Sequence, residues 1–203
     1  PRRSKVRFVA EQMNLHLDVQ FAKNFFQPGV WANEMEGVDS TPSGNQFLKF
    51  SDANFDPVHF FNARRREIKL SGRREPNKLA LGYDAYIALT EHPDILERVK
   101  YTGSTANPAV VTRQVLAQIL QIEEVAVLES TYNVAEPGQE DDMQFICDST
   151  GALLCYATPT PAIDEPSAGY IFTWDMLGNG SWMATDQFEG EAVSYTHLRA
   201  HET

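Results

Sequence analysis

The sequence predicts an α+β fold, and three patterns carry that prediction. Apolar residues recur every three or four positions through much of the first half, which is typical of amphipathic helices. Two short apolar runs, KLALG at 78–82 and EVAVL at 124–128, are bounded by turn residues and predict buried strands. From about residue 145 the sequence favours β-strands, with turns at DSTG and GNG. A strand, helices, a second strand and then several strands fit α/β or α+β, and we favour α+β.

The first helix is expected over residues 3–27. One apolar stripe follows helical spacing (Val6, Val9, Met13, Leu17, Phe21 and Phe25), and a second stripe lies beside it (Leu15, Val19, Ala22 and Phe26). Two stripes predict a helix that is buried on two sides. Pro28-Gly29 should end it, and residues 30–50, rich in Gly, Ser, Asn and Pro, predict a loop.

The second helix is expected to begin at Asp56-Pro57, with Asp as the N-cap and Pro in the first turn. Its later part carries four cations that suit the negative end of the helix dipole (Arg64, Arg65, Arg66 and Lys69), and Ser71-Gly72 should end it. After the strand at 78–82, a helix is expected over 83–91. His92-Pro93 interrupts that helix, and a short helix through Ile95 and Val99 follows.

The last helix should be capped by Asn107-Pro108, with Val111, Val115, Ile119 and Ile122 on one face. The strand at 124–128 comes next, and then an acidic loop, GQEDD. Further strands are expected at 145–147, 152–157, 169–174 and from residue 182.

Composition excludes several classes of protein. The 203 residues carry a net charge of −11, which disfavours nucleic-acid binding through phosphate contacts because such contacts need clustered Lys and Arg. Two cysteines in a chain of this length do not make a disulfide framework, so a reducing compartment is expected. No apolar run approaches the ~20 residues that span a bilayer, so no membrane partner is expected.

Several motifs invite a chemical interpretation, and each has a simpler one that we favour. Glu140-Asp141-Asp142 lacks the ligand spacing of a calcium loop and fits a solvated loop. Asp148-Ser149-Thr150-Gly151 resembles the aspartic-protease turn, but it has one residue too many and no matched second Asp, so a hairpin turn is favoured. Gly178-Asn179-Gly180 has no following helix or lysine for a phosphate loop.

The remaining candidates are single side chains and one basic cluster. His16, His59 and His92 have no partner at triad spacing and are expected to be structural. Cys147 and Cys155 lie in apolar text and are expected to be inert thiols. The cluster Arg64-Arg65-Arg66 fits a salt-bridging face at a subunit contact, or a solvated face, better than a phosphate site. We therefore predict no catalytic, cofactor-binding or metal site, and no enzyme activity.

The last residues hold a histidine pair that we interpret differently. His197 and His201 stand four apart beside Glu202, which on a helix suits one metal ion. However, VSYTHLRAHET at 193–203 resembles the translation of a common transposase-based sequencing adapter. We therefore exclude 193–203 from fold prediction. We expect the chain to be truncated at both ends.

One long segment resembles a known family. Residues 72–101, GRREPNKLALGYDAYIALTEHPDILERVKY, resemble the signature region of tailed-bacteriophage major capsid proteins. That family carries Gly-Arg-x-x-Pro-Asn-x-Leu-x-Leu-Gly, followed by Leu-x-x-His-Pro-Asp-Ile and a Val/Ile-Lys-Tyr. Flanking stretches agree, among them Ser51-Asp52 to Asp56-Pro57, EEVAVLESTYNVAEPGQEDDM and PSAGYIFTW. The resemblance covers nearly all of residues 6–190.

The resemblance implies the Hong Kong 97 fold, with an axial domain and a partial peripheral domain that contains a spine helix. Residues 1–50 would be the end of the spine helix and a loop, 51–180 the axial domain, and 181–192 the start of the return to the peripheral domain. It implies a non-enzymatic shell subunit of the virion, assembled in the bacterial host cytoplasm. The subunit would form pentamers and hexamers with copies of itself around double-stranded DNA, without sequence-specific binding. A scaffold or head protease and a portal are the implied further partners.

Two other functions stay open at this point. An encapsulin-like compartment shell would share the fold and hold protein cargo instead of DNA. A hydrolase that uses Asp148 or a histidine is the remote alternative, and it requires a pocket that gathers Asp148 with His16, His59 or His92.

Overall fold

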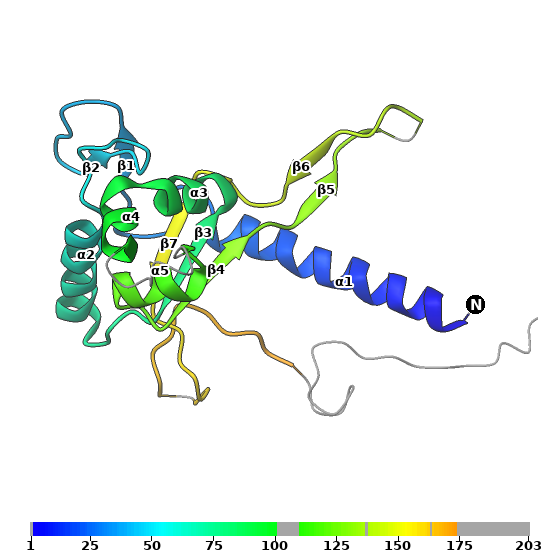
Figure 1. The fold of residues 1–203 in the computed structure, drawn as a ribbon. Coiled ribbons are helices and arrows are strands. Elements are labelled where there is room, and N and C mark those ends of the chain that lie inside the picture. The colour runs from blue at the N-terminus through cyan, green and yellow to red at the C-terminus, as the bar shows by residue number, and fades with distance from the viewer. Residues whose placement is uncertain (1, 101–109, 137, 163, 174–203) are drawn as a thin grey trace, which may run out of the picture. The chain divides into compact units, whose positions relative to one another are not determined.

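The computed structural model describes residues 2–100, 110–136, 138–162 and 164–173 (Figure 1). The chain divides into two units, residues 1–168 and 169–203, and the elements below all belong to the first. The GNG turn, the strand from residue 182 and the segment 193–203 lie outside the described residues. Those three expectations stay predictions, as do the domain boundaries at 50, 180 and 192. The expected cap at Asn107-Pro108 was wrong, because the last helix begins at Arg113 and its N-cap is Thr112, whose hydroxyl accepts from the Val115 N–H at 3.3 Å.

A three-stranded mixed sheet lies at the centre of the first unit. β3 (Lys78–Gly82) is flanked by β4 (Glu124–Leu128), which runs parallel to it, and by β7 (Ala152–Cys155), which runs antiparallel. Leu79 pairs with Val125 on one side and with Leu154 on the other. The central position leaves β3 with no free edge, and its Leu79, Leu81 and Gly82 are buried, which agrees with its apolar sequence. The predicted bounds of β3 and β4 and the α+β class are confirmed.

Four helices pack around this sheet (Figure 1): α2 (Pro57–Gly72), α3 (Tyr83–Glu91), α4 (Pro93–Lys100) and α5 (Arg113–Leu120). Their apolar faces meet the sheet in one core (Phe50, Phe55, Phe61, Leu79, Leu81, Ala85, Leu89, Ile95, Leu116, Ala117, Leu120, Ile122 and Val125). The predicted helix at 83–91 and the break at His92-Pro93 are confirmed. On α5 the fully buried face holds Leu116, Ala117 and Leu120, beside the expected face.

The ends of α2 follow the predicted capping chemistry. The Asp56 carboxylate accepts a hydrogen bond from the backbone N–H of His59 at 2.9 Å, and Pro57 occupies the first turn. At the other end, Arg73 adopts a left-handed conformation with φ 56°, and its N–H donates to the Lys69 carbonyl at 3.0 Å. The α2 helix therefore begins where predicted and includes Gly72.

Short strands were the main features that the sequence did not predict. The expected loop at 30–50 contains two parallel strands, β1 (Glu36–Val38) and β2 (Gln46–Leu48). The acidic loop is the tip of a hairpin of β5 (Thr131–Asn133) and β6 (Met143–Phe145), so the strand expected at 145–147 begins and ends earlier. Three residues are too few to show a period of two, which explains these errors.

Two further strand predictions were wrong, the first in the length of the strand and the second in its existence. β7 stops at Cys155 because the Asn77 side chain replaces the ladder at Ala157, where its amide donates to the carbonyl and its oxygen accepts from the N–H, both at 2.9 Å. Residues 169–173, expected to form a strand, contain none in the part that the structure describes.

The first helix, α1 (Arg2–Phe25), has the predicted bounds to within two residues, but not the predicted burial. Phe26, just after the helix, is the one buried member of the two apolar stripes, while Val6 and Val9 are 59% and 55% exposed. No described part of this unit covers the N-terminal half, so its apolar stripe faces solvent. No described helix is long and apolar enough to cross a bilayer.

Candidate functional site

His92 is buried and fully engaged in the core. Its ring is 2% exposed, and its Nε2 lies 3.0 Å from the carbonyl oxygen of Asp52. Its Nδ1 accepts a hydrogen bond from the backbone N–H of Asp94 at 3.3 Å, so Nε2 must carry the proton that the Asp52 carbonyl accepts. The ring also meets Phe55 edge to face at 6.2 Å. His92 therefore holds the segment before α2 against the α3–α4 junction, as a structural histidine.

The other two described histidines lie on the surface, and the hydrogen bonds of the Asp148 side chain go to Thr150. His16 is exposed on α1, 3.4 Å from the Gln20 amide, and His59 is exposed in the first turn of α2. Neither described pocket is lined by any of these residues. Neither of these two pockets therefore provides the constellation that the hydrolase alternative requires.

Asp148 organises a turn. Its carboxylate accepts hydrogen bonds from the backbone N–H and the hydroxyl of Thr150, at 2.9 and 2.8 Å. The predicted hairpin interpretation was wrong, because the flanking strands β6 and β7 pair with β5 and β3, not with each other. The turn packs instead on the first turn of α3, where Ser149 accepts from the Ala85 N–H at 3.0 Å and its hydroxyl donates to Asp84.

Burial makes both thiols poor nucleophiles. It raises the pKa of Cys147 to about 11, helped by the negative charge of Asp18, and it also raises the pKa of Cys155 despite the opposing effect of Lys78. A thiol with a raised pKa holds little thiolate at neutral pH. Cys147 is buried and Cys155 is partly buried, so the expectation of unreactive thiols agrees with their surroundings.

The arginine cluster forms ion pairs within the chain. Arg64 pairs with Glu67 at 2.6 Å and lies over the Phe60 ring, and Arg65 pairs with Glu75, which Lys69 also contacts at 3.0 Å. Lys69 and then Arg65 hold the pKa of the Glu75 carboxyl below its ordinary value. The salt-bridging interpretation therefore describes Arg64 and Arg65.

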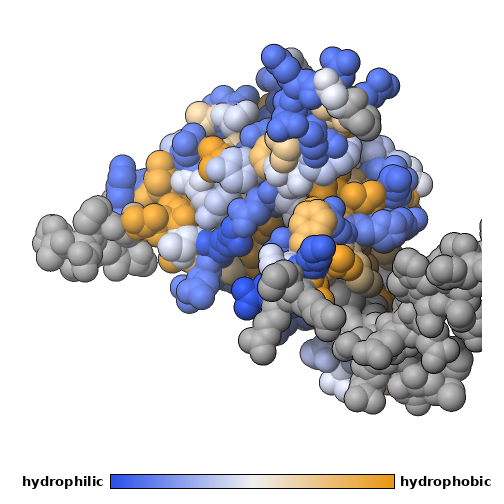
Figure 2. Space-filling model, turned by 90° about the vertical axis from the view of Figure 1, so that its right-hand side faces the viewer, coloured by the Kyte–Doolittle hydropathy of each residue, from blue (hydrophilic) through white to orange (hydrophobic). Residues whose placement is uncertain are grey.

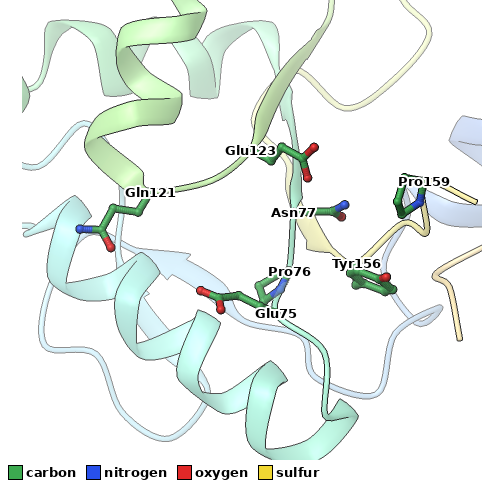
Figure 3. A pocket seen from close by; sticks show the side chains of 7 residues that line it. All are labelled: Glu75, Pro76, Asn77, Gln121, Glu123, Tyr156 and Pro159. Atoms are coloured by element: carbon green, nitrogen blue, oxygen red, sulfur yellow. The ribbon is translucent and has the colours of Figure 1, made fainter.

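Beside Glu75 lies a pocket of about 410 Å³, lined by Glu75, Pro76, Asn77, Gln121, Glu123, Tyr156 and Pro159 (Figure 3). Its main polar groups already have partners. The Glu75 carboxylate binds Lys69 and Arg65, and the Asn77 amide binds the backbone of Ala157. No nucleophile and base lie together among its lining residues, so we assign it no reaction.

The GRREPN segment at 72–77 has a structural role that its geometry explains. Arg74 pairs with Glu165 at 2.8 Å, Glu75 joins it to α2, and Asn77 joins it to the chain after β7. Each of these contacts fixes the entry to the central strand β3. The most distinctive motif of the sequence therefore positions the core.

The acidic residues 140–142 are exposed at the tip of the β5–β6 hairpin, as the solvated-loop interpretation expected. Asp141 accepts from the Asn133 amide at 2.8 Å and Asp142 from the Gln144 amide at 3.0 Å. Among the described residues, no three His, Cys, Asp or Glu side chains lie close enough to hold a metal ion.

Exposed apolar side chains gather on two elements that the sequence analysis did not single out as surfaces. The hairpin exposes Tyr132, Val134, Met143 and Phe145, and the N-terminal half of α1 exposes Val6, Phe8 and Val9. Figure 2 shows a face on which hydrophobic groups lie exposed between hydrophilic ones. The useful signal in the sequence was an apolar stripe next to a run of charge, in RRSKVRFV and again in EDDMQF.

One contact joins these two elements at their base. The Ser130 hydroxyl, just before β5, donates to the Asp18 carboxylate of α1 at 2.6 Å. Asp18, Ser130 and Cys147 also line a second pocket of about 250 Å³. No spacing in the sequence connects residues 112 positions apart, so this contact could not be predicted.

Comparison with known proteins identifies two phage proteins that are similar to this chain. No family model matches the chain. The major capsid protein of Burkholderia phage BcepMu is 32% identical over a 131-residue alignment that covers 60% of this chain and 38% of that protein. The crystal structure of a phage-related protein from Bordetella bronchiseptica RB50 matches with a TM-score of 0.64 and 25% identity, over 81% of this chain and 50% of that one.

The chain therefore spans 38% and 50% of the lengths of these two relatives. Over the matched stretch it is homologous to a phage major capsid protein. This relative is a structural protein and not an enzyme, in agreement with the expectation from the sequence.

Proposed function

We propose that this chain is a structural subunit of a phage head shell. The observation that carries the proposal is the 32% identity to a phage major capsid protein over 131 residues. The structural likeness to a phage-related protein, with a TM-score of 0.64, supports it independently of that alignment. We further propose the Hong Kong 97 type of fold, with residues 51–180 in the axial domain and α1 in the spine.

Two features of the surface support a role in assembly. Apolar side chains on α1 and on the β5–β6 hairpin are exposed, although burying such groups stabilises a protein in water. A hairpin of two strands is also marginally stable alone, and all six of its strand residues are exposed. Both elements would become covered in a shell of repeated subunits, in pentamers and hexamers of this chain.

The charge of the chain suits a container for DNA. A net charge of −11 repels phosphate groups, so a shell of this protein would enclose double-stranded DNA without adhering to it. The proposed location is the virion, after assembly in the host cytoplasm with a scaffold or head protease and a portal. An encapsulin-like shell would instead hold protein.

The test is to express the reading frame that encodes this chain in a bacterial host, with and without its neighbouring head genes. Negative-stain microscopy should show closed particles of uniform size, and sedimentation velocity should show a large discrete species. Only monomers under every condition would contradict the proposal. Nuclease-protected DNA in particles made with the head genes supports the phage shell, whereas a protein cargo supports the compartment alternative.

A further inference from the structure

The hairpin formed by residues 131–145, called the acidic hairpin below, carries charge of one sign. It holds Glu136, Glu140, Asp141 and Asp142 and no Lys or Arg, which gives a charge of −4. None of these four carboxylates pairs with a cation among the described residues. The two that make hydrogen bonds use the neutral amides of Asn133 and Gln144.

The acidic hairpin also exposes apolar side chains on both faces. Because Thr131 pairs with Phe145 and Asn133 with Met143, Met143 and Phe145 share one face of the ribbon. Tyr132 and Val134 lie on the other face. Met143 is 58% exposed, while Phe145 stacks on Tyr83 with ring centroids 5.4 Å apart.

The N-terminal turns of α1, residues 2–9 (RRSKVRFV), called the basic helix end below, have the complementary character. Four cations and no acidic residue give a charge of +4 in a chain whose net charge is −11. Val6, Phe8 and Val9 are all more than half exposed. Lys5 and Arg7 form no ion pair within the described residues, so their charges are available to a partner.

Both elements extend from one joint, the hydrogen bond between Ser130 and Asp18. From Asp18 to Arg2 the helix rises ~24 Å, and from Ser130 to Gly138 an extended chain covers roughly 26 Å. The acidic tip of the hairpin and the basic residues 2–9 thus lie at similar distances from this joint. Folding one arm onto the other within a chain would turn the hairpin about this joint, whereas a neighbour's hairpin requires no change in either arm.

We infer that, in the assembled protein, the acidic hairpin of one copy docks on the basic helix end of a second copy. Opposite charges of equal size set the register, and the exposed apolar side chains of both surfaces form the buried centre. The two surfaces differ, so the contact is heterologous, and each copy gives a hairpin to one neighbour and receives one from another. Such contacts form a ring when the rotation between neighbouring copies closes, as pentamers and hexamers require. The inference rests on the proposed function, because it names the partner as another copy in the shell.

A charge-swap experiment tests this contact in the protein expressed from its reading frame. Lys5→Glu with Arg7→Glu reverses two charges on the helix, and Glu136→Lys with Glu140→Lys reverses two on the hairpin. Each pair should raise the protein concentration needed for assembly about tenfold in sedimentation velocity, because it brings the net charge of the altered surface to zero and sets like charges against each other at the altered positions. The fourfold variant should return to within about threefold of the unaltered protein. Arg98→Glu with Lys100→Glu, the same charge change at exposed positions on α4, serves as the control and should have little effect.

A crosslinking experiment shows which chains are in contact. A Val9→Cys protein and a differently tagged Met143→Cys protein, mixed before assembly and oxidised with copper phenanthroline, should form a disulfide that joins the two tags. Particles that assemble normally with either charge reversal, or that give no crosslink between the tags, overturn the inference and leave the proposed shell function standing. Failure of the unaltered protein to assemble at all contradicts the proposed function itself.

Discussion

The junction between β3 and α3 depends on a glycine at residue 82. A Cβ atom there would lie 2.3 Å from the carbonyl oxygen of Asp148 and 2.4 Å from the carbonyl carbon of Ser149. These are backbone atoms, and two hydrogen bonds hold them in place. The N–H of Gly82 donates to the Gly151 carbonyl at 2.9 Å, and the N–H of Ala85 donates to the Ser149 carbonyl at 3.0 Å. Gly82→Ala must therefore displace the turn at 148–151.

The magnitude follows from these contacts. Overpacking in a tight interior typically costs about 1–3 kcal/mol. Weakening one or two backbone hydrogen bonds adds about 1 kcal/mol each. We expect Gly82→Ala to lower the free energy of unfolding by about 2–5 kcal/mol.

Gly72→Ala is the matched control. A Cβ at Gly72, the last residue of α2, meets nothing within 4 Å. Alanine is favoured over glycine in helices, so this variant should be neutral or more stable by up to ~1 kcal/mol. Urea unfolding of the chain, followed by far-UV circular dichroism, measures both variants. Equal midpoints for Gly82→Ala and the unaltered chain would refute the close packing of the turn on the junction.

Three further predictions concern other parts of the first unit. His92→Ala should lower the free energy of unfolding by about 2–4 kcal/mol, measured by the same assay. It removes the acceptor of the Asp94 N–H and one of the two hydrogen bonds to the Asp52 carbonyl, and it opens a cavity in the core. Glu34→Gln should loosen the turn at 29–34, measured as a change in Trp31 fluorescence at neutral pH. Acidification of the unaltered chain from about pH 4.5 downward should also change the Trp31 fluorescence, because it protonates Glu34. Cys147 should react with iodoacetamide at pH 8 far more slowly in the folded chain than in urea, because burial disfavours its thiolate.

The sign of the Glu34 effect follows from its hydrogen bonds. Its carboxylate accepts from the backbone N–H of Gly29 at 2.8 and 2.9 Å and from that of Trp31 at 2.9 Å. The bonds from Gly29 and then Trp31 lower the pKa of Glu34 from its ordinary 4.5. A lowered pKa in the folded state contributes stability that is present above the unfolded pKa and is lost as pH falls through the folded pKa. Fluorescence that stays constant through this range would contradict the assignment.

The other two predictions have their own controls. His59 is exposed, so His59→Ala should leave the unfolding midpoint nearly unchanged, and a loss equal to that of His92→Ala would contradict the structural role of His92. For the thiols, equal labelling rates in folded and unfolded chains would show that Cys147 is accessible. Mass spectrometry of a peptide digest separates Cys147 from Cys155.

Local chemistry made the helices and central strands predictable. Asp56 before Pro57 marks the start of α2, and the apolar runs that became β3 and β4 are long enough to stand out. His92-Pro93 breaks the α3–α4 pair because the residue before proline is disfavoured in helical conformation, and His92 is in fact extended with ψ 131°. These signals lie within a few residues of the feature that they specify.

Features that depend on distant partners could not be predicted. Asn77 ends β7 from 80 residues away, and Ser130 meets Asp18 across 112 positions. The predicted burial of α1 was wrong for a related reason. Its two apolar stripes predict that the helix is buried against another surface. The sequence pattern does not show whether that surface belongs to the same chain. The exposed Val6 and Val9 instead belong to the surface that we propose binds another copy.

The central claim, that this chain is a shell subunit, is tested most directly by the particles themselves. The reading frame that encodes it should be expressed with its neighbouring head genes, and the lysate fractionated and viewed by negative-stain electron microscopy. We expect closed, uniform particles in which this chain is the most abundant protein. A protein that stays monomeric under every condition, with no particles in any fraction, would show that this chain is not a shell subunit.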